Sequence, residues 1–129
     1  MNKRMAVLLA LMLMLQYSCK KKKEYVPATV AVYVKHHGAL IPAAKVYVKY
    51  DAKEFPGTEA SNYNDSAVCG VEGHGIGHAH FKDLAAGDYY FYSTGYDSTI
   101  MDEVIGGIGL TVGESEEKQE LTLDIPVTE

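Results

Sequence analysis

Four potential metal ligands lie within twelve residues near the middle of the chain: Cys69, His74, His78 and His80. Side chains two positions apart on a strand point the same way and lie roughly 7 Å apart, so the imidazoles of His78 and His80 can both reach one ion. His74 or Cys69 would supply a third ligand, because glycines between them permit the chain to fold back. These donors suit zinc or copper, although no established zinc spacing matches them. The alternative interpretation is that the histidines are solvated polar residues on the outer face of a strand.

The remaining polar groups indicate no catalytic site. His36 and His37 lie in a predicted hairpin, where adjacent side chains point to opposite sides and rarely bind one ion together. Asp97, Asp102 and Glu103 match no calcium-loop spacing and are expected to be solvated turn residues. The chain contains no Gly-x-Ser-x-Gly elbow and no glycine motif at a strand-to-helix turn. We therefore expect a protein that is not an enzyme and carries no cofactor, apart from the candidate Zn or Cu site.

Two further features could form binding surfaces or reactive groups. Tyr90 and Tyr92 are predicted to face outward from a strand and to form a flat amphipathic patch for a sugar or a protein partner. Tyrosine is also simply a good strand former, which is the alternative. The long segment 51–66 is a second candidate contact surface, since loops of this length are often functional or disordered. Cys69 has apolar and acidic neighbours in the sequence, which favours a buried, inert thiol over a reactive one.

Period-two alternation of apolar residues predicts the elements that position these groups. The clearest case is the stretch 78–97, which predicts a strand, a turn at residues 85–88 and a second strand. Its first strand places Ala79 and Phe81 inward and His78 and His80 outward. Further strands are predicted near residues 29–35, 45–50, 67–71, 104–112 and 119–127, and no segment after the first fifteen residues has a helical apolar pattern. The glycine-rich strand at 104–112 suggests a bulge or a close backbone approach.

Residues 77–97 also carry a resemblance to a known family. The order Gly77-x-Ala-x-Phe-x-x-Leu84, Gly87-x-Tyr89, Gly95-Tyr-Asp97 resembles the carboxypeptidase regulatory-like (transthyretin-like) β-sandwich domains, common in envelope proteins of Bacteroidetes-type bacteria. The resemblance includes the hairpin at 38–46 and spans about residues 29–127. It departs at Ala43, where the family usually has glycine, and at Gly73-His74, where it usually has Thr-Asp. Proteins with many different functions contain this fold, so the resemblance implies little about activity.

Two short sequences resemble the acceptor motif of the Bacteroidetes O-glycosylation system. They are Asp65-Ser66-Ala67 and Asp97-Ser98-Thr99, and they make Ser66 and Ser98 candidate modification sites. Both serines are predicted to lie in loops, which suits a bulky modification.

The first eighteen residues are expected to be a lipoprotein signal peptide. Lys3-Arg4 is followed by an uninterrupted apolar run of eleven residues from Met5 to Leu15, which is shorter than the roughly 20 that cross a membrane. The run ends at Leu15-Gln-Tyr-Ser-Cys19, which resembles a bacterial lipobox and makes Cys19 the predicted site of lipid (palmitate) attachment. Ordinary cleavage to a soluble periplasmic protein is the alternative. Residues 19–27, with lysines at 20–23, would form a basic tether near anionic headgroups.

The charge of the chain excludes one class of partner. From Cys19 onward there are ten lysines, no arginine and seventeen acidic residues, a formal net charge of −7. Such a chain repels phosphate backbones, so we expect no nucleic-acid partner. A transthyretin-like hydrolase would need a site bearing histidine and arginine, and the absence of arginine counts against that activity.

The sequence therefore predicts an all-β protein, with a single transthyretin-like or Ig-like antiparallel β-sandwich of about seven strands at residues 28–129. We expect a lipid-anchored protein of the cell envelope, at the outer membrane with its domain facing the periplasm. Its expected role is a non-enzymatic interaction or structural module, with an envelope protein or a glycan as the candidate partner. The alternative is a metal-binding lipoprotein that uses His74, His78 and His80.

Overall fold

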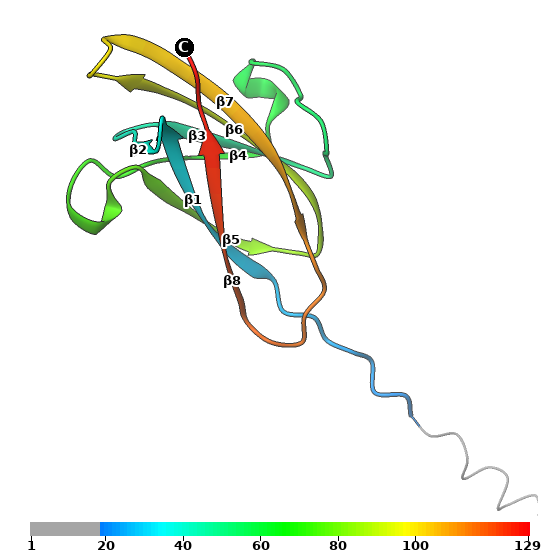
Figure 1. The fold of residues 1–129 in the computed structure, drawn as a ribbon. Coiled ribbons are helices and arrows are strands. Elements are labelled where there is room, and N and C mark those ends of the chain that lie inside the picture. Colours follow the sequence, from blue (N-terminus) through cyan, green and yellow to red (C-terminus); the bar gives the residue numbers. More distant parts are fainter. Residues whose placement is uncertain (1–18) are drawn as a thin grey trace, which may run out of the picture.

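The computed structural model describes residues 19–129, so the predicted signal peptide at residues 1–18 lies outside the described part of the chain. The strands in that part are β1 (Ala28–His36), β2 (Ala39–Leu40), β3 (Lys45–Tyr50), β4 (Asp65–Val68), β5 (His78–Leu84), β6 (Gly87–Asp97), β7 (Asp102–Val112) and β8 (Gln119–Pro126). Two short 3-10 helices, η1 (Ala60–Asn62) and η2 (Gly73–Gly75), lie in the connections. Figure 1 shows the two layers of strands, and the expected all-β sandwich is confirmed.

Each layer is a four-stranded sheet. In one sheet β1 pairs with β2 and β5 along one edge and with β8 along the other, and the second sheet has the order β4-β3-β6-β7. The pair β1–β8 is parallel, whereas every other named pair is antiparallel. The sequence predicted about seven strands, all antiparallel. The parallel pair arises because β7 ends at the end of the sandwich where β1 begins, so β8 starts beside Ala28 and runs in the same direction.

Period-two alternation builds the core between the sheets. Val30, Val32 and Val34 of β1 are fully buried, and the residues between them are partly exposed. The rings of Phe81 and Phe91 meet edge to face across the two sheets, with centroids 5.4 Å apart. Each of these side chains contributes roughly 1.5–3 kcal/mol through removal of apolar surface from water. The predicted inward and outward faces of β5 are confirmed.

A bulge explains why Leu84 faces the core although it lies three positions after Phe81. The register of β5 against β1 shifts between the pairs Val30↔Phe81 and Ala28↔Leu84. Asp83 takes a left-handed backbone conformation (φ 58°) at this shift. The extra residue restores the inward direction of Leu84, which is 3% exposed.

The glycines of β7 mark no bulge, because β6 and β7 pair without a register shift from Gly87↔Val112 to Asp97↔Asp102. They instead allow other parts of the chain to come close to the backbone of β7. A Cβ at Gly106 would collide with the carbonyl oxygen of Pro126. A Cβ at Gly107 would lie 2.8 Å from the ring of Tyr90. The missing side chains thus let β8 approach β7 on one face and the ring of Tyr90 approach it on the other, which is the close backbone approach that the sequence suggested.

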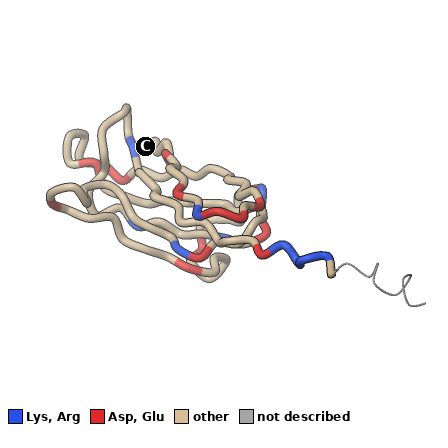
Figure 2. The backbone as a smooth tube through the Cα atoms, turned by 90° about the horizontal axis from the view of Figure 1, so that it is seen from below, with Lys and Arg blue, Asp and Glu red and all other residues tan. Residues whose placement is uncertain are grey.

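The basic residues 20–23 leave the sandwich at one end. Figure 2 shows them as a blue stretch, whereas acidic positions are spread over the strands and loops. The backbone N–H of Val26 donates to the carbonyl oxygen of Ser115 at 2.7 Å, which fixes the point where this segment joins the sandwich. The ion pair between Lys23 and Glu116, at 3.9 Å, is exposed and contributes little.

Candidate functional site

The end of β1 carries a buried histidine, His36, which the sequence predicted only as one of two adjacent histidines in a hairpin. His36 is the last member of the inward row that contains Val30, Val32 and Val34, and it is only 3% exposed. Its Nδ1 lies 2.7 Å from Oδ2 of Asp97, and its Nε2 lies 2.8 Å from Oε2 of Glu129. An ionised carboxylate only accepts hydrogen bonds, so two carboxylate partners favour the imidazolium form of His36, in which both ring nitrogens donate.

Both carboxylate oxygens of Asp97 have hydrogen-bond partners, Oδ2 with His36 and Oδ1 with Thr99. Its Oδ1 accepts hydrogen bonds from the Thr99 backbone N–H at 2.8 Å and from the Thr99 hydroxyl at 2.6 Å. These bonds to Thr99, together with the bond from His36, lower the pKa of Asp97 to about 2. The hydrogen bond to Asp97 is in turn the main reason that the pKa of His36 is raised; burial opposes this rise and Glu129 adds to it. The hydrogen bond between them therefore favours a positive charge on His36 and a negative charge on Asp97, and each charge stabilises the other.

His37 completes what we call the His36 cluster: His36, His37, Asp97, Thr99 and Glu129. His37 adopts a left-handed conformation (φ 47°) in the turn to β2, and its ring centroid lies 4.2 Å from that of His36. The expectation that adjacent histidines point to opposite sides is wrong here, because it holds only for extended backbone. The expectation of a solvated Asp97 is also wrong, since Asp97 is 7% exposed.

The cluster has no arrangement for nucleophilic catalysis. In an Asp-His pair that activates a nucleophile, the second ring nitrogen faces a hydroxyl or a thiol. Here Nε2 of His36 faces the carboxylate of Glu129. The hydroxyl of Thr99, which contacts the pair, donates to Asp97 instead.

The metal ligands predicted from the sequence are not brought together. No three of Cys69, His74, His78 and His80 have ligand atoms within 4.8 Å of one another, and His36, His37 and Glu129 are the group of the described residues that meets this criterion. Cys69 belongs to the hydrophobic core, where burial raises the pKa of its thiol to about 11, as expected of an inert cysteine. His74 lies in η2 and is exposed.

His78 and His80 do share the outer face of β5. Their ring centroids are 5.1 Å apart, and Tyr33 stacks on His78 at 4.9 Å. The Nδ1 atom of His78 is buried and has no hydrogen-bond partner among the described residues. Two imidazoles without a third ligand do not make a closed metal site.

The outer face of the second sheet carries an aromatic cluster. We call it the outer aromatic cluster: Tyr47, Phe55, Tyr63, Tyr90 and Tyr92. Tyr92 is its centre, with ring centroids at 5.4 Å to Phe55, 5.8 Å to Tyr63 and 6.1 Å to Tyr47. Tyr92 points outward as predicted but is only 4% exposed, because the rings of Phe55 and Tyr63 cover it. The flat, open patch expected of Tyr90 and Tyr92 is thus partly closed.

The segment between β3 and β4 provides this cover. It is held by hydrogen bonds from the Tyr63 hydroxyl to the carbonyl oxygen of Gly57 at 2.7 Å and from the Asn62 side chain to that of Pro56 at 2.9 Å. The backbone N–H of Asn64 donates to the Val48 carbonyl oxygen at 2.9 Å. The predicted loop 51–66 is therefore an ordered cover over the outer aromatic cluster, and its last two residues belong to β4.

An open groove of about 300 Å³ runs beside this cover. It is lined by Phe55, Tyr90, Tyr92, Ile105, Gly106 and Gly107. Phe55 is 50% exposed and Ile105 46% exposed, so two of the large apolar side chains that line the groove face solvent. We call this feature the Phe55 groove.

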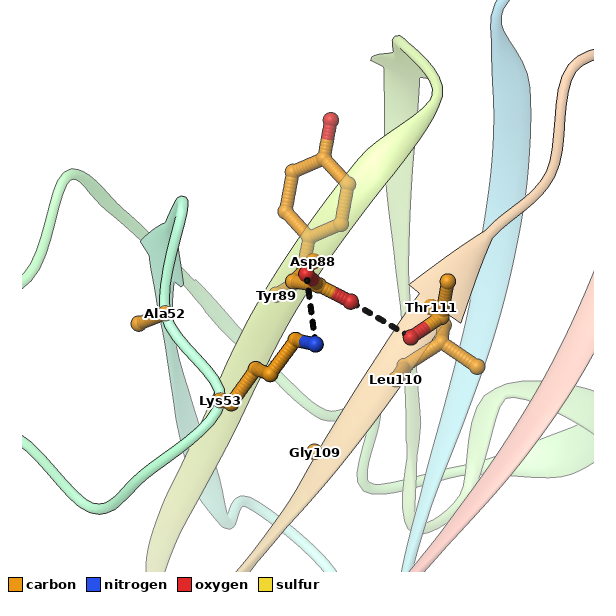
Figure 3. Close-up of a pocket in the computed structure, with 7 residues that line it drawn as sticks. All are labelled: Ala52, Lys53, Asp88, Tyr89, Gly109, Leu110 and Thr111. Carbon is orange, nitrogen blue, oxygen red and sulfur yellow. Dashed lines mark hydrogen bonds and ion pairs between the residues drawn. The ribbon is translucent and has the colours of Figure 1, made fainter.

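A second pocket, of about 200 Å³, lies next to the cover and is shown in Figure 3. Asp88 reaches Lys53 at 3.6 Å and accepts a hydrogen bond from the Thr111 hydroxyl at 2.5 Å. Tyr89 projects to the other side of β6, where its hydroxyl donates to the Ala85 carbonyl oxygen at 2.6 Å. Lys53, Asp88 and Thr111 are therefore one another's polar partners in this pocket. Because Lys53 belongs to the segment after β3, Asp88 to β6 and Thr111 to β7, these contacts join that segment to the two strands.

The remaining predicted site residues lie on the surface. Ser98 lies in the exposed turn after β6, whereas Ser66 lies in the edge strand β4 and not in a loop. Cys19 is exposed at the start of the described chain. Nothing in the geometry around these three residues tests their modification, which stays a prediction.

In comparisons with known proteins, no protein-family model matches the chain, and neither does any curated protein. None of the helices in the described part has the length and hydropathy to span a membrane.

Proposed function

We propose that this protein is a lipid-anchored envelope protein whose β-sandwich, of the carboxypeptidase regulatory-like kind, is a non-enzymatic interaction module. The Phe55 groove is the proposed contact surface. The observation that carries the proposal is that Phe55 and Ile105, two large apolar side chains that line one groove, are both about half exposed to solvent.

The chemistry of the groove favours a protein partner over a glycan. Phenol hydroxyls are the polar groups of the side chains that line it, and none of the lining side chains carries an amide or a carboxylate. A sugar ring needs several such partners for its hydroxyls, whereas an apolar side chain of a protein needs only the aromatic walls. The proposed partner is an envelope protein that inserts an apolar or aromatic side chain between Phe55 and Ile105.

Site-specific photocrosslinking in intact cells tests this contact. A photoreactive phenylalanine analogue at position 55 should give one defined protein adduct, and the substitution Ile105→Lys should abolish it. The matched control is the same analogue at Lys82, which is exposed on the outer face of β5 in the other sheet. The partner identified at position 55, once purified, should bind wild type at least about tenfold more tightly than Ile105→Lys.

Other outcomes would refute the proposal. Equal adducts at positions 55 and 82, or an adduct that survives Ile105→Lys, would show that the groove is not the contact surface. Chemical-shift changes of Tyr90 on addition of envelope glycans, without a protein adduct, would identify a glycan-binding module instead.

The anchoring proposal has a separate test. Cys19→Ser should move the protein from the membrane fraction to the soluble fraction, and mass spectrometry of the wild-type N-terminus should show a fatty-acylated cysteine. A wild-type N-terminus without fatty acid would refute the anchor and leave the groove proposal standing.

A further inference from the structure

We propose that His36, His37 and Glu129 form a three-ligand site for a divalent transition-metal ion, with Zn²⁺ as the ion that best matches these donors. Their ligand atoms all lie within 4.8 Å of one another. Two imidazoles and one carboxylate, with a fourth position open to water, are a donor set that Zn²⁺ commonly takes. This proposal is independent of the Phe55 groove.

The dimensions of the cluster suit a small ion. A tetrahedral Zn²⁺ with bonds of about 2.1 Å separates its ligand atoms by about 3.4 Å. Nε2 of His36 and Oε2 of Glu129 are 2.8 Å apart, so they need to separate by only about half an ångström. His37 and Glu129 are exposed and can rotate, whereas buried His36 supplies a fixed point.

The surroundings of His36 supply the outer shell that metal-binding histidines usually have. A histidine ligand almost always donates its other ring N–H to a carboxylate or a carbonyl, which fixes its orientation. Nδ1 of His36 makes this bond to Asp97, and Asp97 is itself held by Thr99. Nε2 is therefore the free coordinating atom once its proton leaves to solvent, and Zn²⁺ takes the place of that proton between His36 and Glu129.

Zinc titration of the full-length chain tests the site. The protein is stripped with EDTA, transferred to chelator-free buffer and titrated with Zn²⁺ against a chromophoric chelator. We expect one ion per chain, and we expect His37→Ala and Glu129→Gln each to weaken binding by about 10–100-fold or more. Both substitutions are at exposed positions, so the fold should be retained, and circular dichroism checks it.

The matched control is the double variant His78→Ala/His80→Ala, which changes the other histidine pair. It should bind Zn²⁺ with unchanged affinity. In NMR spectra, the ring signals of His36 and His37 should shift on addition of one equivalent. The proposal is overturned if wild type binds no Zn²⁺, if His37→Ala and Glu129→Gln bind as wild type does, or if the control variant loses the site instead.

Discussion

Replacement of Tyr92 by alanine tests whether the segment between β3 and β4 packs on the outer face of the second sheet tightly enough to form a second hydrophobic core. Tyr92 is 4% exposed and contacts three aromatic rings. Truncation of a buried Phe or Trp to alanine costs about 3–5 kcal/mol, and each aromatic pair contributes roughly 0.5–1.5 kcal/mol beyond burial. We therefore expect Tyr92→Ala to lower the free energy of unfolding by about 3–4 kcal/mol.

Urea unfolding followed by circular dichroism measures this change. With an m value near 2 kcal/mol/M, the midpoint should fall by roughly 1.5–2 M. Tyr92→Phe keeps the ring and should stay within about 1 kcal/mol of wild type, and Tyr96→Ala, at a position 54% exposed, should stay within about 0.5 kcal/mol. A loss below about 1 kcal/mol for Tyr92→Ala would refute the reasoning, because the face would then be open in solution.

Three further predictions concern the His36 cluster, β7 and the core thiol. The pKa of His36 is raised above 6.5, so its contribution to stability is complete below pH 6.5 and is lost as the pH rises through its folded pKa. The pKa of Asp97 is lowered from 3.8 to about 2, so its contribution is lost as the pH falls through that range. The difference in urea midpoint between wild type and His36→Gln should therefore be largest at about pH 4–6.5, and a difference that is flat with pH would contradict this. Gly106→Ala should lower the urea midpoint and the yield of folded protein, because its Cβ would meet the carbonyl oxygen of Pro126, whereas Gly113→Ala, with open space around it, should not. The Cys69 thiol should react with a disulfide reagent at pH 8 only in denaturant, and fast reaction in native buffer would show that it is accessible.

The strands and the core could be predicted because period-two alternation is a local property of the sequence. Val30, Val32 and Val34, and likewise Phe81 and Phe91, occupy the inward positions that the alternation assigns to them. The parallel pairing of β1 with β8 could not be predicted in this way, since it depends on which end of the sandwich the chain reaches after β7.

The sequence drew attention to His36 and His37 as a pair but not to the buried cluster that they form with Asp97 and Glu129, although part of that signal was present. The same alternation that buries Val34 also buries His36, and the row that contains Phe91 and Ser93 leads inward to Asp97. A charged or polar residue at the end of an apolar row therefore predicts a buried partner across the sheets. The contribution of Glu129 depends on the path of the chain after β8, and the position of the His37 ring depends on a left-handed turn, so neither follows from alternation.

The opposite ends of β1 give the molecule a defined polarity. The strand begins at the tether and ends at His36, and nine extended residues span roughly 30 Å. If Cys19 is anchored and β1 points directly away from the bilayer, the histidine end lies more than three Debye lengths from the headgroups at physiological salt, where each length is about 8 Å. Cations would reach it at their bulk concentration, without the enrichment that an anionic bilayer produces at its own surface.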